Sequence, residues 1–286
     1  MMNISFDLSG KIDRQKVDAL LAIKKETDSL NIDFFVVGAF ARDIILKHYE
    51  KKSRRVTEDI DLGINIADWA QFDKLTNSLI STGKFSRTKD QQRYLYNSIQ
   101  KIDIIPFGAI AGKKDIINWP DHEMYMTVVG FQEVFKNSFM VRLNCDPDLD
   151  VKVPTFPGLT IMKLVAWRDR FPDRQKDAGD LSIIMNEYED AGNTVRLYDE
   201  APTLLEEEGF DLKLASIRLL GRDMALIADQ ETANVIKSLF QSKKYFPHKL
   251  IVDIIQERRI LNDNYETISL QLEKLKKGFI ETLEKR

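Results

Sequence analysis

Two short segments decide the fold of this chain: Val36-Val37-Gly38-Ala39-Phe40-Ala41-Arg42 and Thr57-Glu58-Asp59-Ile60-Asp61-Leu62. In the first, an apolar run reaches a glycine, and a helix-like pattern follows. A glycine lets a phosphate approach the backbone, and the N-terminus of a helix attracts anions. In the second, an apolar run carries two aspartates at positions i and i+2. On a strand their carboxylates point to the same face, about 6.5–7 Å apart along the chain.

Three carboxylates in this part of the sequence indicate a metal site. Asp59 and Asp61 would repel each other side by side, and a cation relieves that repulsion. Ligands that are all oxygen favour a hard metal such as Mg²⁺. The third acid, Asp103, lies between Ile102 and Ile104, where burial is costly unless the acid is paired or binds metal. Asp-x-Asp also occurs in ordinary loops, and Asp103 could face solvent from a strand edge, but the three parts in this order favour a metal–nucleotide site.

This order of motifs resembles the nucleotidyltransferase superfamily, whose pattern is a Gly-Ser or Gly-Gly turn, then Asp-x-Asp, then a third acid on a neighbouring strand. The resemblance implies a mixed sheet flanked by helices. It also implies two-metal transfer of a nucleoside monophosphate from an NTP, with release of pyrophosphate. Ala39 stands where many members have Ser. The phosphate-binding hydroxyl is then absent but the backbone N–H donors remain, so we expect weakened nucleotide contact rather than lost activity.

A second group of motifs lies further along the chain. Lys163-Leu164-Val165-Ala166-Trp167-Arg168-Asp169-Arg170 reads as a helix, and Phe171-Pro172 ends it because the residue before a proline avoids the α region. Asp173 can cap the next helix, which carries Lys176-Asp177-Ala178-Gly179-Asp180-Leu181. From the residues alone, a surface helical hairpin with ordinary ion pairs is as good an interpretation as a functional site.

Taken with Arg55-Val56-Thr57-Glu58-Asp59-Ile60-Asp61-Leu62, these motifs resemble the AbiEii-type nucleotidyltransferases, which include toxins of bacterial type IV toxin–antitoxin systems. The resemblance covers roughly residues 33–185. It implies that Asp59 and Asp61 hold Mg²⁺, with Asp103 as a third ligand or as the group that activates the acceptor hydroxyl. It further implies a catalytic role for Lys163, on the triphosphate, and for Asp177. Residues implied to contact the nucleotide are Gly38, Ala39, Arg42, Thr57 and Lys163.

The 286 residues are 43% hydrophobic and 30% charged, which suits two globular domains. We expect an α+β fold: a nucleotidyltransferase-like mixed sheet with flanking helices over residues 1–153, then an all-helical domain over 154–286 that contributes Lys163 and Asp177. Strands are expected at 34–37, 59–66, 85–88, 93–99, 101–107, 124–131 and 139–143, with an extended crossing segment at 151–156. Helices are expected at 11–30, 39–48, from the Asp68 cap through 79, and near 158–171, 174–190, 211–228, 231–241, 247–261 and 264–284.

Charge and composition limit the partners. A net charge of −3 argues against a globally basic nucleic-acid binder. The single cysteine excludes an internal disulfide, and the chain shows neither a membrane-length apolar run nor a signal-peptide pattern, so we expect a cytoplasmic protein without membrane contact. Between the two nucleotide-site motifs, basic residues outnumber acidic ones. These basic residues form either an ordinary solvated surface or a contact for RNA. These basic residues are Arg42, Lys47, Lys51, Lys52, Arg54 and Arg55.

Three functions remain open from the sequence. The first is an enzyme that transfers an NMP from an NTP to RNA such as tRNA, in a toxin-like role with an antitoxin protein as partner. The second is a small-molecule nucleotidyltransferase of the antibiotic-modifying type, whose acceptor has no need of the basic residues at 42–55. The third is a non-catalytic nucleotide- or partner-binding module, which has no need of three convergent carboxylates.

Overall fold

The computed structural model describes residues 4–51, 57–112, 115–120, 125–169, 175–257 and 264–286, and its contacts divide the chain into two units, Met1–Thr155 and Phe156–Arg286. The sequence-based predictions for Lys52, Arg54, Arg55, Arg170 and Asp173 lie outside the described residues. Among the described helices, none combines the length and the apolar character that a bilayer span requires.

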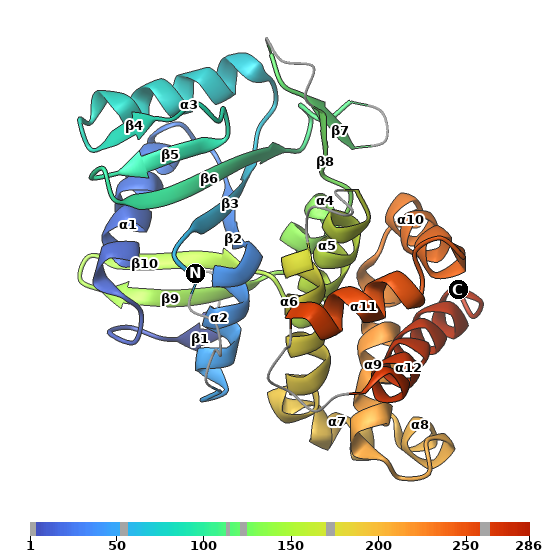
Figure 1. The fold of residues 1–286 in the computed structure, drawn as a ribbon. Helices are drawn as coiled ribbons and strands as arrows, with labels where there is room; N and C mark the ends of the chain where they lie inside the picture. The colour runs from blue at the N-terminus through green and yellow to red at the C-terminus, as the bar shows by residue number, and fades with distance from the viewer. Residues whose placement is uncertain (1–3, 52–56, 113–114, 121–124, 170–174, 258–263) are drawn as a thin grey trace. The chain divides into compact units, whose positions relative to one another are not determined.

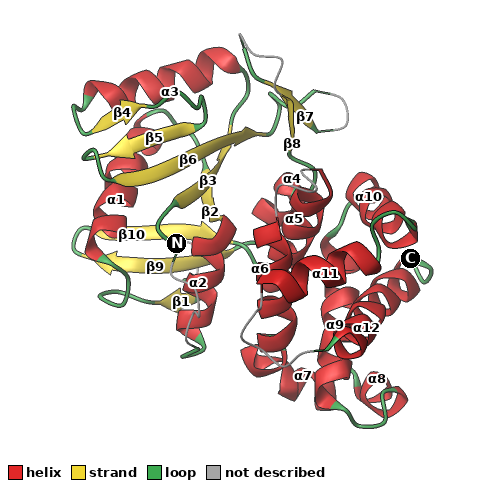
Figure 2. Cartoon of the chain, in the orientation of Figure 1, coloured by secondary structure: helices red, strands yellow, loops and turns green. Residues whose placement is uncertain are grey.

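An eight-stranded mixed sheet forms the centre of the first unit (Figures 1 and 2). In spatial order, its strands are β1 (Phe6–Asp7), β9 (Phe139–Cys145), β10 (Asp148–Val153), β2 (Phe34–Val37), β3 (Ile60–Asn65), β6 (Gln100–Phe107), β5 (Arg93–Tyr96) and β4 (Phe85–Arg87). Two further strands, β7 (Ile116–Asn118) and β8 (Tyr125–Thr127), pair separately. The middle strands β2, β3 and β6 carry the predicted site, and β3 runs antiparallel to β2 and parallel to β6.

Helices α1 (Arg14–Ser29) and α3 (Trp69–Ser81) contact each other and lie against the sheet. The predicted cap is confirmed: the Asp68 side chain accepts a hydrogen bond from the Gln71 N–H at the start of α3. Tyr94 is buried and hydrogen-bonds with Thr76 of α3, so it marks the face that α3 covers. Because successive strand residues alternate between faces, the side chain of Arg93 belongs to the opposite face.

That opposite face is packed with aromatic side chains beyond the acidic residues. Phe35 and Phe107 lie with ring centroids 5.3 Å apart, and Phe135 of the short helix α4 (Phe131–Lys136) lies 5.5 Å from each. Gly63 is opposite Phe35 in the strand register, and a Cβ there would overlap the Phe35 ring. The glycine therefore leaves room for the Phe35 ring to pack against β3, the strand that carries Asp61.

The second unit consists of helices in its described residues (Figure 1). They are α5 (Phe156–Asp169), α6 (Gln175–Glu187), α7 (Thr194–Asp199), α8 (Pro202–Glu207), α9 (Leu212–Ile227), α10 (Gln230–Gln241), α11 (His248–Glu257) and α12 (Tyr265–Leu283), with a kinked turn at Glu189–Asn193. Every residue of α5 from Phe156 to Val165 is buried, so α5 is the central helix. Helices α9 and α12 cross at two glycines, Gly221 and Gly278, where an added Cβ would overlap the backbone of the partner helix.

The predicted fold class, a mixed sheet with flanking helices followed by a helical region, is confirmed. Two local predictions differ in part from the structure. The strand predicted over 124–131 is described only at Tyr125–Thr127, because Gly130 at φ +89° turns the chain and α4 begins at Phe131. The segment predicted as an extended crossing is in part a full strand: β10 pairs with both β9 and β2.

Candidate active site

The turn after β2 brings a glycine against a carboxylate. Gly38 has φ +70° and is the first residue of α2 (Gly38–His48), directly after four buried residues of β2. A Cβ built at Gly38 would overlap Asp61 Oδ2 and lie 2.8 Å from Asp61 Cγ. No L-residue with a side chain adopts this backbone easily. Glycine is therefore required twice here, for the backbone angle and for the close approach of the Asp61 side chain.

The strand register places two of the predicted acids side by side. Asp61 on β3 pairs with Asp103 on β6, and Asp103 pairs in turn with Arg93 on β5. Residues in register on neighbouring strands point to the same face, so these three side chains form a row across the sheet. The row lies on the face opposite α3. Asp59 immediately precedes β3 and is joined to the row by its contact with Arg93.

Arg93 compensates the acidic charge of this row. Its Nε and Nη2 each donate a hydrogen bond of 2.7 Å to the two oxygens of Asp103, and Nη2 lies 3.4 Å from Asp59 Oδ2. The hydrogen bonds to Asp103 raise the pKa of Arg93, against the opposing effect of burial. Lys101 Nζ is 4.0 Å from Asp59 Oδ1. A bidentate arginine–carboxylate pair is among the strongest charged contacts in proteins, so Asp103 is firmly held.

A divalent metal fits part of this donor set. Asp59 and Asp61 offer oxygen ligands of the kind that Mg²⁺ prefers. Both oxygens of Asp103 already accept from Arg93, and within the described residues no three His, Cys, Asp or Glu side chains come together as a metal cluster. The residues therefore fit a site built on the Asp59–Asp61 pair. The role of Asp103 as a third ligand stays a prediction, and it requires Arg93 to release at least one oxygen.

The other predicted nucleotide contacts differ in position. Ala39 follows Gly38 in the first turn of α2. Thr57 Oγ1 lies 3.5 Å from the Asp59 carbonyl oxygen, and the Thr57 carbonyl accepts a 2.6 Å hydrogen bond from Lys16 Nζ. Arg42 is fully buried and donates to Asp43 Oδ1 from Nε at 3.0 Å and from Nη2 at 2.6 Å. The structure thus places the Arg42 guanidinium in the interior of the unit, where its direct contact with phosphate stays a prediction.

The second predicted group lies within the helical unit. Lys163 on α5 is buried, with Nζ 2.9 Å from Asp177 Oδ1 and 2.6 Å from Asp180 Oδ2, both on α6. Burial alone would lower the pKa of Lys163, but the charges of Asp180 and Asp177 outweigh it and raise the pKa. The hairpin is therefore not the exposed ion-pair surface that the residues alone allowed. It holds a buried lysine between two buried carboxylates.

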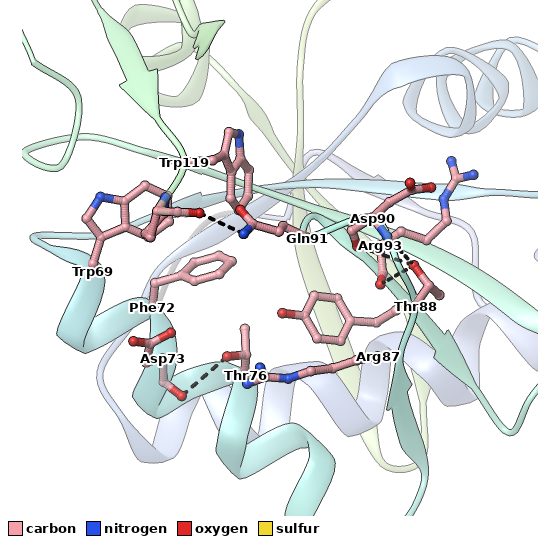
Figure 3. Close-up of a pocket in the computed structure, with 12 residues that line it drawn as sticks. Trp69, Phe72, Asp73, Thr76, Arg87, Thr88, Asp90, Gln91, Arg93 and Trp119 are labelled. Atoms are coloured by element: carbon pink, nitrogen blue, oxygen red, sulfur yellow. Dashed lines mark hydrogen bonds between the residues drawn. The ribbon is translucent and has the colours of Figure 1, made fainter. Parts of the chain in front are cut away.

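An aromatic cavity of about 260 Å³ lies on the α3 face of the sheet. Figure 3 shows Trp69 and Phe72 from α3 facing Trp119, with ring centroids 5.3–5.7 Å apart. The Gln91 side-chain amide donates to the Pro120 carbonyl at its edge. In the same figure the Arg93 guanidinium points away from these rings. Arg93 is also among the residues that line the cavity, so the cavity borders the acidic row at this residue, whose guanidinium belongs to the row.

Sequence reasoning missed two residues of the site. Neither Arg93 nor Lys16 was singled out as a site residue from the sequence. The signal for Arg93 was available: if strands end at Tyr96 and begin at Gln100, hairpin register places residue 93 opposite residue 103, as observed. The contact of Lys16 with the Thr57 carbonyl joins α1 to a segment 41 residues away, and no local pattern predicts such a pair.

The comparisons with known proteins give weak likenesses. No family model and no curated protein matches the chain. Among solved structures, the antibiotic-resistance factor ANT(2'')-Ia is 13% identical, covers 69% of this chain and 98% of its own, and has a TM-score of 0.37. The Thermotoga maritima CCA-adding enzyme complexed with tRNA is 13% identical over 96% of this chain and 83% of its own, with a TM-score of 0.28. A CCA-adding enzyme with CTP is 17% identical over 96% and 68%, with a TM-score of 0.33. These neighbours are nucleotidyltransferases, but likenesses with TM-scores under 0.5 support no conclusion about the site of this chain.

Proposed function

We propose that this protein is a Mg²⁺-dependent nucleotidyltransferase that moves an NMP from an NTP to an acceptor hydroxyl. One observation carries the proposal. The Asp61 carboxylate lies against Gly38 at the N-terminus of α2, in register with Asp103. A helix N-terminus that opens on a glycine offers backbone donors for phosphate. A carboxylate at the same point, with a second one two residues before it, offers the oxygen ligands that a phosphate-bound cation needs.

Each group then has a role in the transfer. The backbone N–H groups at Gly38 and Ala39 would hold the donor's phosphates. Asp59 and Asp61 would hold Mg²⁺, which supplies charge neutralisation at the attacking and leaving oxygens. Arg93 holds the Asp103 carboxylate in place beside them through two hydrogen bonds. The protein contributes mainly position and charge, which is what an in-line phosphoryl displacement requires.

Lys163 and Asp177 enter this proposal through the resemblance to AbiEii-type enzymes. In that role Lys163 neutralises charge on the triphosphate and Asp177 orients Lys163. The observed pair Lys163–Asp177 at 2.9 Å is compatible with the second part. The first part requires Lys163 to exchange a carboxylate partner for a phosphate, which its 9% exposure makes demanding.

For the acceptor we favour RNA, such as tRNA, over a small molecule. The support is the excess of basic residues in the sequence from Lys47 to Arg55, five against one acidic residue, because a polynucleotide binds cationic surface and a small acceptor does not need it. A toxin-like role in the cytoplasm, with an antitoxin protein as partner, belongs to the same proposal. Growth arrest on expression of the intact chain, and its absence with the Asp61→Ala variant, would support that role.

Pyrophosphate release tests the proposed chemistry. The protein is incubated with each of the four NTPs, with and without Mg²⁺ and total RNA, and pyrophosphate is measured by a coupled enzyme assay. We expect release with at least one NTP, dependent on Mg²⁺ and stimulated by RNA, and no release by the Asp61→Asn variant. A non-catalytic binding module would instead bind NTP without releasing pyrophosphate. Release stimulated by an aminoglycoside rather than by RNA would favour the small-molecule enzyme.

A further inference from the structure

A basic cleft of about 890 Å³ runs along α2 in the first unit. One wall is a single face of α2, where Phe40, Ile44 and Lys47 recur at helical spacing. The facing wall is the turn before α1 and the first turns of that helix, with Lys11 and Lys16. Lysines from segments far apart in the sequence therefore meet in one concave surface.

The charge of the cleft is positive after its internal pairs are counted. The lysines that line it are Lys11, Lys16, Lys47 and Lys51, and the carboxylates are Asp13, Asp43 and Glu50. Two of the carboxylates have structural partners: Asp43 accepts from the buried Arg42, and Asp13 caps α1 by accepting from the Lys16 N–H. With Arg42 balancing Asp43, cations exceed anions by two.

Lys16 connects the cleft to the acidic row. It is half-buried, its Nζ lies 4.5 Å from the centroid of the Phe40 ring, and it donates to the Thr57 carbonyl oxygen. Burial lowers the pKa of Lys16, while the charges of Asp43, Asp13 and Asp59 oppose that shift. The Thr57 hydroxyl in turn lies 3.5 Å from the Asp59 carbonyl oxygen, so the end of the cleft at Lys16 and Thr57 adjoins the proposed metal ligand Asp59.

We propose that this cleft holds the phosphodiester backbone of the acceptor strand and leads its terminal hydroxyl to the Asp59–Asp61 pair. The inference rests on the proposed function and identifies the acceptor of that site. From Phe40 to Lys47 the wall is about 10 Å long at 1.5 Å per residue, which matches about three successive phosphates of a stacked strand. Lysines spread over such a length can each contact one singly charged phosphate of the strand. The compact triphosphate of the donor instead belongs at Gly38, at the start of α2.

A charge-reversal pair with a matched control tests the cleft. The test pair is Lys11→Glu with Lys47→Glu, both exposed residues that line the cleft. The control pair is Lys84→Glu with Lys89→Glu, also exposed on the first unit but outside the cleft, with the same change in net charge. Binding of a fluorescein-labelled single-stranded RNA oligonucleotide is followed by anisotropy over a range of salt concentrations. Binding of a non-hydrolysable NTP analogue is measured by calorimetry.

We expect the test pair to weaken RNA binding at least tenfold and to reduce the slope of log K against log salt by about 1.4, since each lost contact on a single strand removes about 0.7. The control pair should change neither quantity by as much as half, and both pairs should retain analogue binding. Equal losses in the two pairs, or no RNA binding by the intact protein, would overturn the inference. Loss of analogue binding in parallel with RNA would instead assign the cleft to the donor. Absence of pyrophosphate release by the intact protein would contradict the proposed function alone, because RNA binding is measured separately.

Discussion

Replacing Gly38 by alanine tests the close approach on which the site depends. An alanine at φ +70° costs about 1–2 kcal/mol for the left-handed backbone. Its Cβ would also overlap Asp61 Oδ2 and lie 2.8 Å from Cγ, so the Asp61 side chain must leave its rotamer, at about 0.5–1.5 kcal/mol. The sum is about 1.5–3.5 kcal/mol of unfolding free energy. A carboxylate displaced by about 1 Å or more should lower transfer by about 10²-fold.

Gly83→Ala is the matched control for this substitution. Gly83 has φ +72°, in the same unit, and a Cβ there meets no atom within 4 Å. Gly83→Ala should therefore lose only the unfolding free energy that the left-handed backbone costs an alanine. Unfolding in urea and the rate of NMP transfer are measured for both variants. A double variant with Asp61→Ala adds a further check, because removing the carboxylate should reduce the cost of Gly38→Ala to that of Gly83→Ala.

Two results would contradict the proposed contact between Gly38 and Asp61. In the first, Gly38→Ala is no less stable than Gly83→Ala and transfers NMP at the normal rate. In the second, the cost of Gly38→Ala is the same with and without the Asp61 carboxylate. Either result would mean that the carboxylate does not lie against the turn. The backbone angle alone would then explain the glycine.

The remaining predictions concern the charged groups. Asp59→Ala or Asp61→Ala should abolish transfer while circular dichroism shows an intact fold, and full activity of the double variant would exclude the proposed metal pair. Lys163→Met removes the ammonium group that contacts two buried carboxylates and should cost about 3–5 kcal/mol in urea unfolding. If activity per folded molecule also falls about 10²-fold, the lysine acts on the triphosphate as well. Arg93→Gln releases Asp103 and should raise the affinity for Mn²⁺ in calorimetry, whereas unchanged affinity would show that Asp103 takes no part in cation binding.

Local sequence patterns predicted the elements that bear the site, because those elements have strong local signals. The apolar run before Gly38 and the alternation around Asp61 belong to strands buried on both faces. Asp68 was recognisable as a cap because a short acidic side chain can accept from the exposed N–H groups of a helix start. Helix α4 was missed because its six residues are too few to show a helical period, and the preceding apolar residues resemble a strand.

The partners of charged side chains were harder to predict, because they depend on contacts distant in sequence. Lys163 was recognised as a residue on a helical hairpin, but its burial follows from the packing of α5 on nearly all sides. Arg42 was predicted to contact phosphate or RNA or to lie on a solvated surface, and its complete burial depends on how α2 lies against the sheet. Arg93 could have been found from hairpin register, since a turn at Asn97 and Ser98 with positive φ fixes which residues are opposed.

The fate of the two ends of the triphosphate tests nucleotidyl transfer most directly. Parallel reactions contain an NTP labelled with ³²P at the α- or the γ-phosphate, Mg²⁺ and total RNA, and the products are separated by gel and by thin-layer chromatography. We predict α-label on RNA, γ-label in pyrophosphate, and neither product with the Asp61→Asn variant. Release of γ-label as inorganic phosphate, with no α-label on any acceptor, would contradict nucleotidyl transfer, because the protein would then hydrolyse NTP rather than transfer its nucleotide.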